Sequence, residues 1–117
     1  MENNYEEHQT RADRIQKDID TLGSYSSVKT IGCTRYTYTK EFAQARDYIK
    51  REMEQAGLQV REDAVGTVIG RLEGTNPELP IIMTGSHFDT VKTGGRYDGA
   101  AGVVAALEVA RTMHDEG

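Results

Sequence analysis

The amino-acid sequence predicts a layered α/β fold whose sheet is mixed and incomplete. Three features indicate this class: two amphipathic helical patterns open the chain, short strand patterns follow them, and a long apolar helical pattern ends it. Helices that alternate with strands are typical of folds in which helices cover a sheet. Only three strands can be recognised in the sequence, and an apolar central strand needs a neighbour on each side. We therefore expect residues 1–117 to be the N-terminal part of a longer protein.

The first helix is predicted over Glu6–Leu22. Apolar side chains recur there at helical spacing in otherwise charged sequence, at Ala12, Ile15, Ile19 and Leu22. Such a stripe is typical of a helix that packs on a core, and Gly23 is expected to end it. Residues 23–38 are rich in Ser, Thr, Gly and Tyr with weak periodicity, which indicates a loop. Loops of this length in compact domains tend to be functional or mobile.

The second helix is predicted to begin after Thr39, whose hydroxyl can cap it, and to end at Gly57, which tolerates the left-handed conformation. One face of this helix is apolar and consists of Phe42, Ala45, Ile49, Met53 and Ala56. Residues 58–62 and 67–73 then read as two strands around residues 64–66, which form either a hairpin or two neighbouring strands of the sheet.

A turn is predicted at residues 75–80, followed by a third strand at Ile81–Thr84. This short run is apolar on both faces, which is typical of a strand in the interior of a sheet. From Gly99 the sequence contains no charge before Glu108, so a third helix is expected to begin buried against the sheet. The last turns of that helix, residues 111–116, are polar and are expected to be exposed.

Composition argues against several classes of partner. The formal net charge is −5, and acidic and basic residues are mixed along the chain, so no basic face is expected to bind nucleic acid or anionic lipid. No apolar run approaches the roughly 20 residues that span a bilayer, and the chain opens without an apolar signal core. The single cysteine, Cys33, cannot form an internal disulfide, which fits a reducing compartment. We therefore expect a cytoplasmic protein without nucleic-acid or membrane partners.

The strongest indication of function lies in residues 85–102, where His87, Asp89 and Asp98 stand in a glycine-rich loop between an apolar strand and an apolar helix. His87 and Asp89 are two residues apart, so in extended backbone their side chains point to the same side. Asp89 can then hydrogen-bond one imidazole nitrogen of His87 while the other nitrogen binds a metal. Direct ligation by both residues is the alternative.

Asp98 directly precedes the third helix, where an isolated aspartate usually caps free backbone N–H groups. The surrounding glycines allow the backbone to bend, so Asp98 could instead approach His87 and bridge two cations with its two oxygens. A dinuclear site needs further His, Asp or Glu ligands and a general base. The glycine-rich phosphate-binding motifs are absent, and Ser86 lacks the G-x-S-x-G context of a serine nucleophile.

These residues resemble the M20 family of metallopeptidases and amidohydrolases, in particular its hydantoinase/carbamoylase branch, which includes N-carbamoyl-L-amino acid hydrolases and allantoate amidohydrolases. The similarity runs through most of the chain, in residues 32–35, 56–58, 63–66, 70–74, 85–91 and 94–99. By this resemblance His87 is a terminal ligand to one metal, Asp98 bridges two metals, and Asp89 is the catalytic residue that orients His87. Thr67 and Lys92 depart from the branch, where asparagine and proline are common.

The resemblance implies a truncated zinc-exopeptidase-like fold, in which residues 1–117 are the N-terminal part of an α/β/α metal-dependent catalytic domain without its lid or dimerisation domain. It implies a homodimeric parent enzyme that uses two divalent ions, Zn²⁺, Mn²⁺ or Co²⁺, to hydrolyse an amide or N-carbamoyl C–N bond in a small N-substituted amino acid. Family members carry the general base and the remaining ligands further along the sequence, so the isolated chain is expected to be inactive. An aminoacylase or peptidase of the same family and a non-catalytic binding or assembly module are the alternatives.

Overall fold

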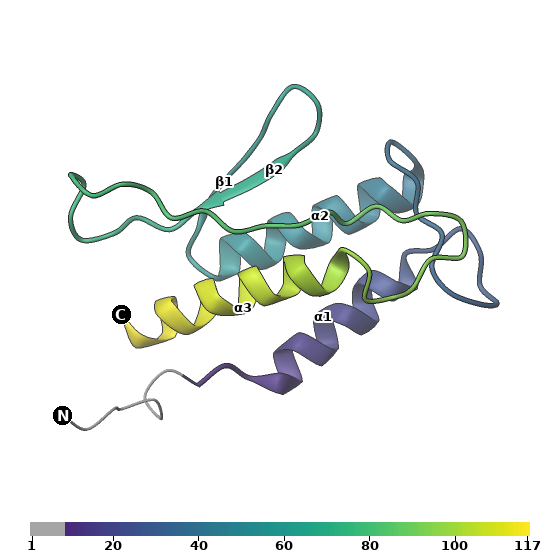
Figure 1. Ribbon diagram of the computed structural model, residues 1–117, viewed down its shortest axis with the longest axis horizontal. Helices are drawn as coiled ribbons and strands as arrows, with labels where there is room; N and C mark the ends of the chain where they lie inside the picture. Colours follow the sequence, from purple (N-terminus) through teal and green to yellow (C-terminus); the bar gives the residue numbers. More distant parts are fainter. Residues whose placement is uncertain (1–8) are drawn as a thin grey trace.

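The computed structural model describes residues 9–117, which form three helices and one β-hairpin (Figure 1). The elements in chain order are α1 (Ala12–Ser24), α2 (Lys40–Gln55), β1 (Gln59–Glu62), β2 (Val68–Arg71) and α3 (Ala100–Glu116). The helices lie side by side, with the hairpin to one side of them (Figure 1). This mixture of helices and strands confirms the predicted α/β class, but the described residues contain two strands where the sequence predicts three.

The core lies where the three helices meet. Its buried apolar side chains come from all of them: Ile19, Leu22, Ala45, Tyr48, Ile49, Ala100 and Val104. Helix α3 packs mainly against α1, while α2 packs against the two strands. The prediction that α3 begins buried is therefore confirmed, but the prediction that it packs on the sheet is wrong, because α2 covers the short hairpin.

Helix α1 begins later than predicted. Residues 6–8 of the predicted helix lie outside the described residues, and residues 9–11 are not helical. The backbone N–H of Arg11 donates a hydrogen bond of 2.7 Å to Oε1 of the buried Glu108 in α3. This contact holds Arg11 in an extended conformation, so the helix starts one residue later.

Helix α1 also runs past the predicted stop at Gly23 and ends at Ser24. Gly23 has no positive φ angle and so does not terminate the helix. A side chain at this position would lie 2.6 Å from Nε of Arg96. The guanidinium of Arg96 therefore packs over this glycine, which lies inside the last turn of the helix.

The second helix and the hairpin agree with the sequence prediction. The Thr39 hydroxyl accepts a hydrogen bond of 3.3 Å from the backbone N–H of Phe42, and Gly57 takes a φ angle of +81°. Strands β1 and β2 pair in antiparallel register, with Gln59 opposite Arg71.

The prediction of a strand at Ile81–Thr84 is wrong for the described residues. The segment has no strand assignment, and Ile81, Ile82 and Met83 are 67, 96 and 83% exposed. A strand is defined by hydrogen bonds to a neighbouring strand, and the hairpin formed by β1 and β2 does not extend to this segment. The apolar pattern was compatible with a strand, but no partner lies beside it in residues 9–117.

The end of α3 is less exposed than predicted. Arg111 and Thr112 are both only 8% exposed, whereas residues 113–116 are exposed as expected. Arg111 is buried because it pairs with Asp18 of α1 and Glu52 of α2. Within residues 9–117, no helix is sufficiently long and apolar to cross a bilayer.

Candidate metal site

His87, Asp89 and Asp98 converge just before α3, as the sequence predicts. Nδ1 of His87 lies 3.1 Å from Oδ1 of Asp89, and Nε2 of His87 lies 4.0 Å from Oδ1 of Asp98. The three side chains are 53, 42 and 64% exposed, respectively. A carboxylate therefore faces each ring nitrogen, and solvent reaches the space between them.

Asp89 fixes the orientation of the imidazole of His87. Both Oδ1 and the backbone carbonyl oxygen of Asp89 lie 3.1 Å from Nδ1. Carbonyl and carboxylate oxygens only accept hydrogen bonds, so the neutral tautomer that satisfies both contacts is the one with its proton on Nδ1 and its lone pair on Nε2. This geometry favours the orienting role of Asp89 over direct ligation, the alternative that the sequence left open.

Asp98 does not act as a side-chain cap of α3. The N-cap residue is Gly99, and no side chain makes a capping hydrogen bond there. Gly99 has a φ angle of +69°, and a Cβ atom at this position would collide with the ring and carbonyl oxygen of His87. A glycine at this turn is thus what allows Asp98 and His87 to approach each other, as the sequence suggests.

A second glycine brings the extended chain onto α3. A Cβ atom at Gly102 would lie 2.7 Å from Cβ of Ser86. Ser86 therefore rests directly on the first turn of the helix, and its neighbour His87 is brought to the helix start.

The donor set suits a divalent metal in kind but is incomplete in number. An imidazole nitrogen and a carboxylate oxygen suit zinc, manganese or cobalt. Two ligand atoms on one tetrahedral zinc lie about 3.4 Å apart, as follows from metal–ligand bonds of about 2.1 Å. The 4.0 Å between His87 and Asp98 is only slightly longer. No group of three His, Cys, Asp or Glu side chains in residues 9–117 is placed to hold an ion, so further ligands are required.

Residues 33–37 support the site, a role that the sequence interpretation missed. Arg35 is only 2% exposed, and its Nε donates a hydrogen bond of 2.7 Å to the carbonyl oxygen of Phe88. Its Nη1 donates to the carbonyl oxygens of Leu22 and Tyr25 at 2.6 and 3.0 Å. Burial lowers the pKa of Arg35, since it disfavours the charged form. The guanidinium thereby ties the end of α1 to the backbone between His87 and Asp89.

Two threonines complete the connection between these segments. The Thr90 hydroxyl accepts a hydrogen bond of 2.8 Å from the backbone N–H of Arg35 and lies 3.0 Å from the carbonyl oxygen of Cys33, to which it can donate. The Thr37 hydroxyl donates a hydrogen bond of 2.9 Å to Oδ2 of Asp89. The sequence signals were the family resemblance of residues 32–35 and the charge of Arg35 within a mostly polar loop, and neither indicated a contact with residues 88–90.

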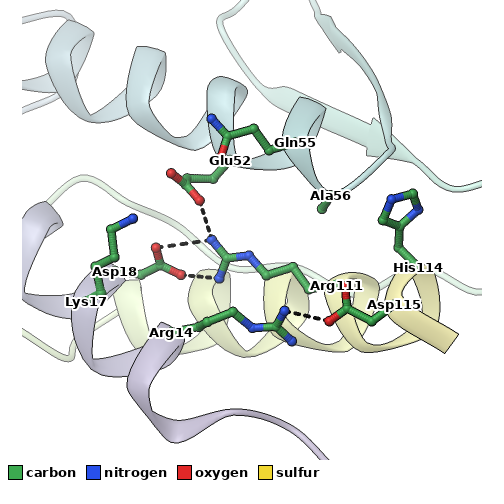
Figure 2. A pocket seen from close by; sticks show the side chains of 9 residues that line it. All are labelled: Arg14, Lys17, Asp18, Glu52, Gln55, Ala56, Arg111, His114 and Asp115. Carbon is green, nitrogen blue, oxygen red and sulfur yellow. Dashed lines mark hydrogen bonds and ion pairs between the residues drawn. The ribbon is translucent and has the colours of Figure 1, made fainter.

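A separate hollow of about 250 Å³ lies at the opposite end of α3 (Figure 2). Most of its charged groups are paired with one another: Arg111 lies 2.5 Å from Asp18 and 2.6 Å from Glu52, and Arg14 lies 2.6 Å from Asp115. Burial alone would lower the pKa of Arg111, but its two carboxylate partners outweigh burial and raise it. No buried side-chain polar atom among the described residues lacks a hydrogen-bond partner. We interpret this network as structural.

Comparison with known proteins agrees with the resemblance noted in the sequence. Residues 67–117 match the model of Peptidase family M28. The chain is 54% identical over 107 residues to an N-carbamoyl-L-amino-acid amidohydrolase of Paenarthrobacter aurescens, covering 92% of this chain and 26% of that protein. It is 49% identical over 89 residues to an allantoate amidohydrolase of Bacillus subtilis, covering 76% of this chain and 22% of the relative.

Solved structures show the same fold. The crystal structure of AtUAH in complex with glyoxylate superimposes with a TM-score of 0.90 at 40% identity, covering 96% of this chain and 26% of that one. A hydantoinase/carbamoylase family amidase from Burkholderia ambifaria gives a TM-score of 0.87 at 31% identity, covering 94% of this chain and 27% of that one. The chain thus spans about a quarter of the length of the proteins it matches. The predicted resemblance to the hydantoinase/carbamoylase branch is confirmed.

Proposed function

Since this chain is homologous to the hydantoinase/carbamoylase amidohydrolases, we propose that it supplies part of a metal-dependent active site that hydrolyses a C–N bond. One observation supports this function above the others. The imidazole of His87 lies between Asp89 and Asp98, with one carboxylate facing each ring nitrogen, in a chain 54% identical to an N-carbamoyl-L-amino-acid amidohydrolase.

In this proposal His87 and Asp98 hold the metal through Nε2 and the carboxylate oxygens. Asp89 keeps the proton of His87 on Nδ1 and so leaves Nε2 free for ligation. Two divalent ions held there would supply an activated water and polarise the scissile carbonyl. Zinc, manganese and cobalt all suit these ligands, and Asp98 is the residue that we assign to bridge two of them.

The proposed substrate is a small N-substituted amino acid that carries an amide or N-carbamoyl group. The names of the relatives support this class, because they include amidohydrolases of N-carbamoyl-L-amino acids and of allantoate. We propose that residues 1–117 form the N-terminal part of the catalytic domain, and that a cytoplasmic homodimer is the active form. The isolated chain is expected to be inactive, since residues 9–117 provide two ligands where a catalytic centre needs more.

Peptide hydrolysis is a second candidate, and a specific finding favours it. The family model that matches residues 67–117 describes a peptidase family, and this range contains His87, Asp89 and Asp98. Peptidases and amidohydrolases both attack a carbonyl carbon bonded to nitrogen, so the same metal ligands serve either reaction.

The proposal is tested by metal analysis and activity assays of the full-length parent protein, comparing the native sequence with the variants His87→Ala and Asp98→Ala. We expect each variant to lose most of the bound metal and nearly all turnover of an N-carbamoyl amino acid. Asp47→Ala is the matched control, because this carboxylate lies on α2 with 55% of its side chain exposed. Unchanged metal content in both site variants would contradict the proposed function, and cleavage of dipeptides in preference to N-carbamoyl amino acids would favour the peptidase.

A further inference from the structure

We infer that Thr37 is a positioning residue for the metal site. Its hydroxyl holds the carboxylate of Asp89, and that carboxylate in turn holds the imidazole ring of His87. This inference rests on the proposed function of His87 as a metal ligand. The relevant chain of contacts has two links: Thr37 Oγ1 donates to Asp89 Oδ2 at 2.9 Å, and Asp89 Oδ1 lies 3.1 Å from His87 Nδ1.

The two contacts use different oxygens of the same carboxylate. With Oδ2 held by Thr37 and Oδ1 held by His87, the plane of the Asp89 carboxylate is fixed at both edges. A carboxylate held only by His87 rotates more freely about its Cβ–Cγ bond, since that torsion is broad for aspartate. Loss of the Thr37 hydroxyl should therefore loosen the imidazole as well as the carboxylate.

The position of Thr37 is set by the neighbouring residue pair Arg35 and Thr90. The backbone N–H of Thr90 donates to the carbonyl oxygen of Arg35 at 2.8 Å, and the backbone N–H of Arg35 donates to the Thr90 hydroxyl at 2.8 Å. These reciprocal bonds align residues 35–37 with residues 88–90. Thr37 then lies within hydrogen-bonding reach of the Asp89 carboxylate.

Thr37 itself contributes little to the hydrophobic core, because it is an exposed residue. Its side chain makes a polar contact with Asp89 and is not among the core residues. Removal of the hydroxyl should therefore change the site without unfolding the protein. Mutation of a residue that orients a metal-bound histidine typically lowers metal affinity or activity by about 10- to 100-fold. Thr37 contacts the histidine only through Asp89, so loss of its hydroxyl should lower the affinity by about 10-fold.

The test compares Thr37→Val, which keeps the shape of the side chain but removes the hydroxyl, with Thr37→Ser, which keeps the hydroxyl. Thr75→Val is the control, at an exposed threonine in the turn before residue 81. Zinc affinity of the full-length parent protein is measured by competition with a chelator, and the tautomer of His87 in the metal-free protein is measured by ¹⁵N NMR. We expect Thr37→Val to weaken zinc binding about 10-fold and to reduce the Nδ1–H population. Thr37→Ser and Thr75→Val should match the native protein.

Several results would overturn the inference. The inference fails if Thr37→Val keeps the native zinc affinity and the native tautomer of His87. It also fails if Thr37→Ser loses as much zinc affinity as Thr37→Val. A loss of affinity in Thr37→Val that only parallels a fall in the thermal unfolding midpoint would also overturn the inference, because it would report folding. If His87→Ala leaves zinc binding unchanged, the proposed function fails instead, and the tautomer in the metal-free protein still decides the role of Thr37.

Discussion

The guanidinium of Arg35 donates a hydrogen bond of 2.7 Å to the carbonyl oxygen of Phe88, the residue between His87 and Asp89. The ring of Phe88 stacks on that of Phe42 in α2, with centroids 4.5 Å apart and planes inclined by 15°. The residue at the centre of the candidate site is thus held through both its backbone and its side chain. The exposed His87 and the half-buried Asp89 depend on this buried support for their positions.

Replacement of Arg35 by lysine should destabilise the protein by about 2–3 kcal/mol, because hydrogen bonds from a buried charged group are lost and an ammonium cannot reproduce the planar fork of the guanidinium. Urea unfolding followed by circular dichroism measures the change. Arg71→Lys is the control, since that side chain is 53% exposed on β2 and should change stability by less than about 0.5 kcal/mol. Equal effects of the two variants would show that Arg35 does not support the site.

Replacement of Gly99 by alanine should destabilise the protein by about 1–3 kcal/mol and impair metal binding. The φ angle of +69° is strained for alanine, and the added methyl group collides with His87. Gly95→Ala is the matched control, because a Cβ atom at Gly95 has no neighbour within 4 Å and no positive φ angle is found there. The two variants are compared by thermal unfolding and zinc content, and the explanation fails if Gly95→Ala is the more disruptive.

The elements that the sequence predicted well are those whose signals are local. Helix α2 carries its own cap at Thr39 and its own terminator at Gly57, so both ends could be identified from neighbouring residues. The start of α1 could not, because it depends on Glu108, which lies 97 residues away along the chain. The segment Ile81–Thr84 shows the same limit, since an apolar pattern carries no information about whether a partner strand is present.

In the candidate site, too, the contacts between residues close in sequence could be predicted and the distant contacts could not. His87 and Asp89 could be paired from the two-residue period of extended backbone, and the glycines near Asp98 indicated a close approach. Arg35 and Thr37 could not be linked to them, because 53 and 52 residues separate the partners and a polar loop has no periodicity that predicts contacts. The sequence therefore predicted which groups meet at the candidate site but not those that support them.

Replacement of Arg111 by methionine should destabilise the protein by about 3–5 kcal/mol, because it leaves the carboxylate of Asp18 buried without its cationic partner. The Asp18 side chain is only 1% exposed, and the Tyr48 hydroxyl is its other bonded partner, at 2.6 Å. Stability is measured by urea unfolding. Arg11→Met is the control, since Arg11 and Asp13 form a pair with side chains 59 and 67% exposed, and it should leave the stability close to the native value. A small effect of Arg111→Met would contradict the assigned role of this network.

The turn between β1 and β2 should make hairpin stability depend on pH through Asp63. Its pKa is held below its usual range mainly because the backbone N–H of Thr67 donates to the carboxylate, and the N–H of Val65 adds to this effect. A carboxyl group with a lower pKa in the folded state stabilises that state above the pKa of the unfolded chain, and this contribution is lost as the pH falls through the folded pKa.

The stability difference between the native protein and Asp63→Asn should therefore be constant between about pH 6 and 8 and should shrink below about pH 4, where the aspartate protonates. Asparagine keeps a side-chain hydrogen-bond acceptor but has no negative charge. Comparison with Asp63→Asn therefore separates the contribution of the charge from the contribution of the turn geometry. Asp63→Ala, which loses both, should differ from Asp63→Asn by an amount independent of pH. Urea unfolding at a series of pH values provides the measurement, and a native-minus-asparagine difference that grows as the pH falls would show that the pKa of Asp63 is raised rather than lowered on folding.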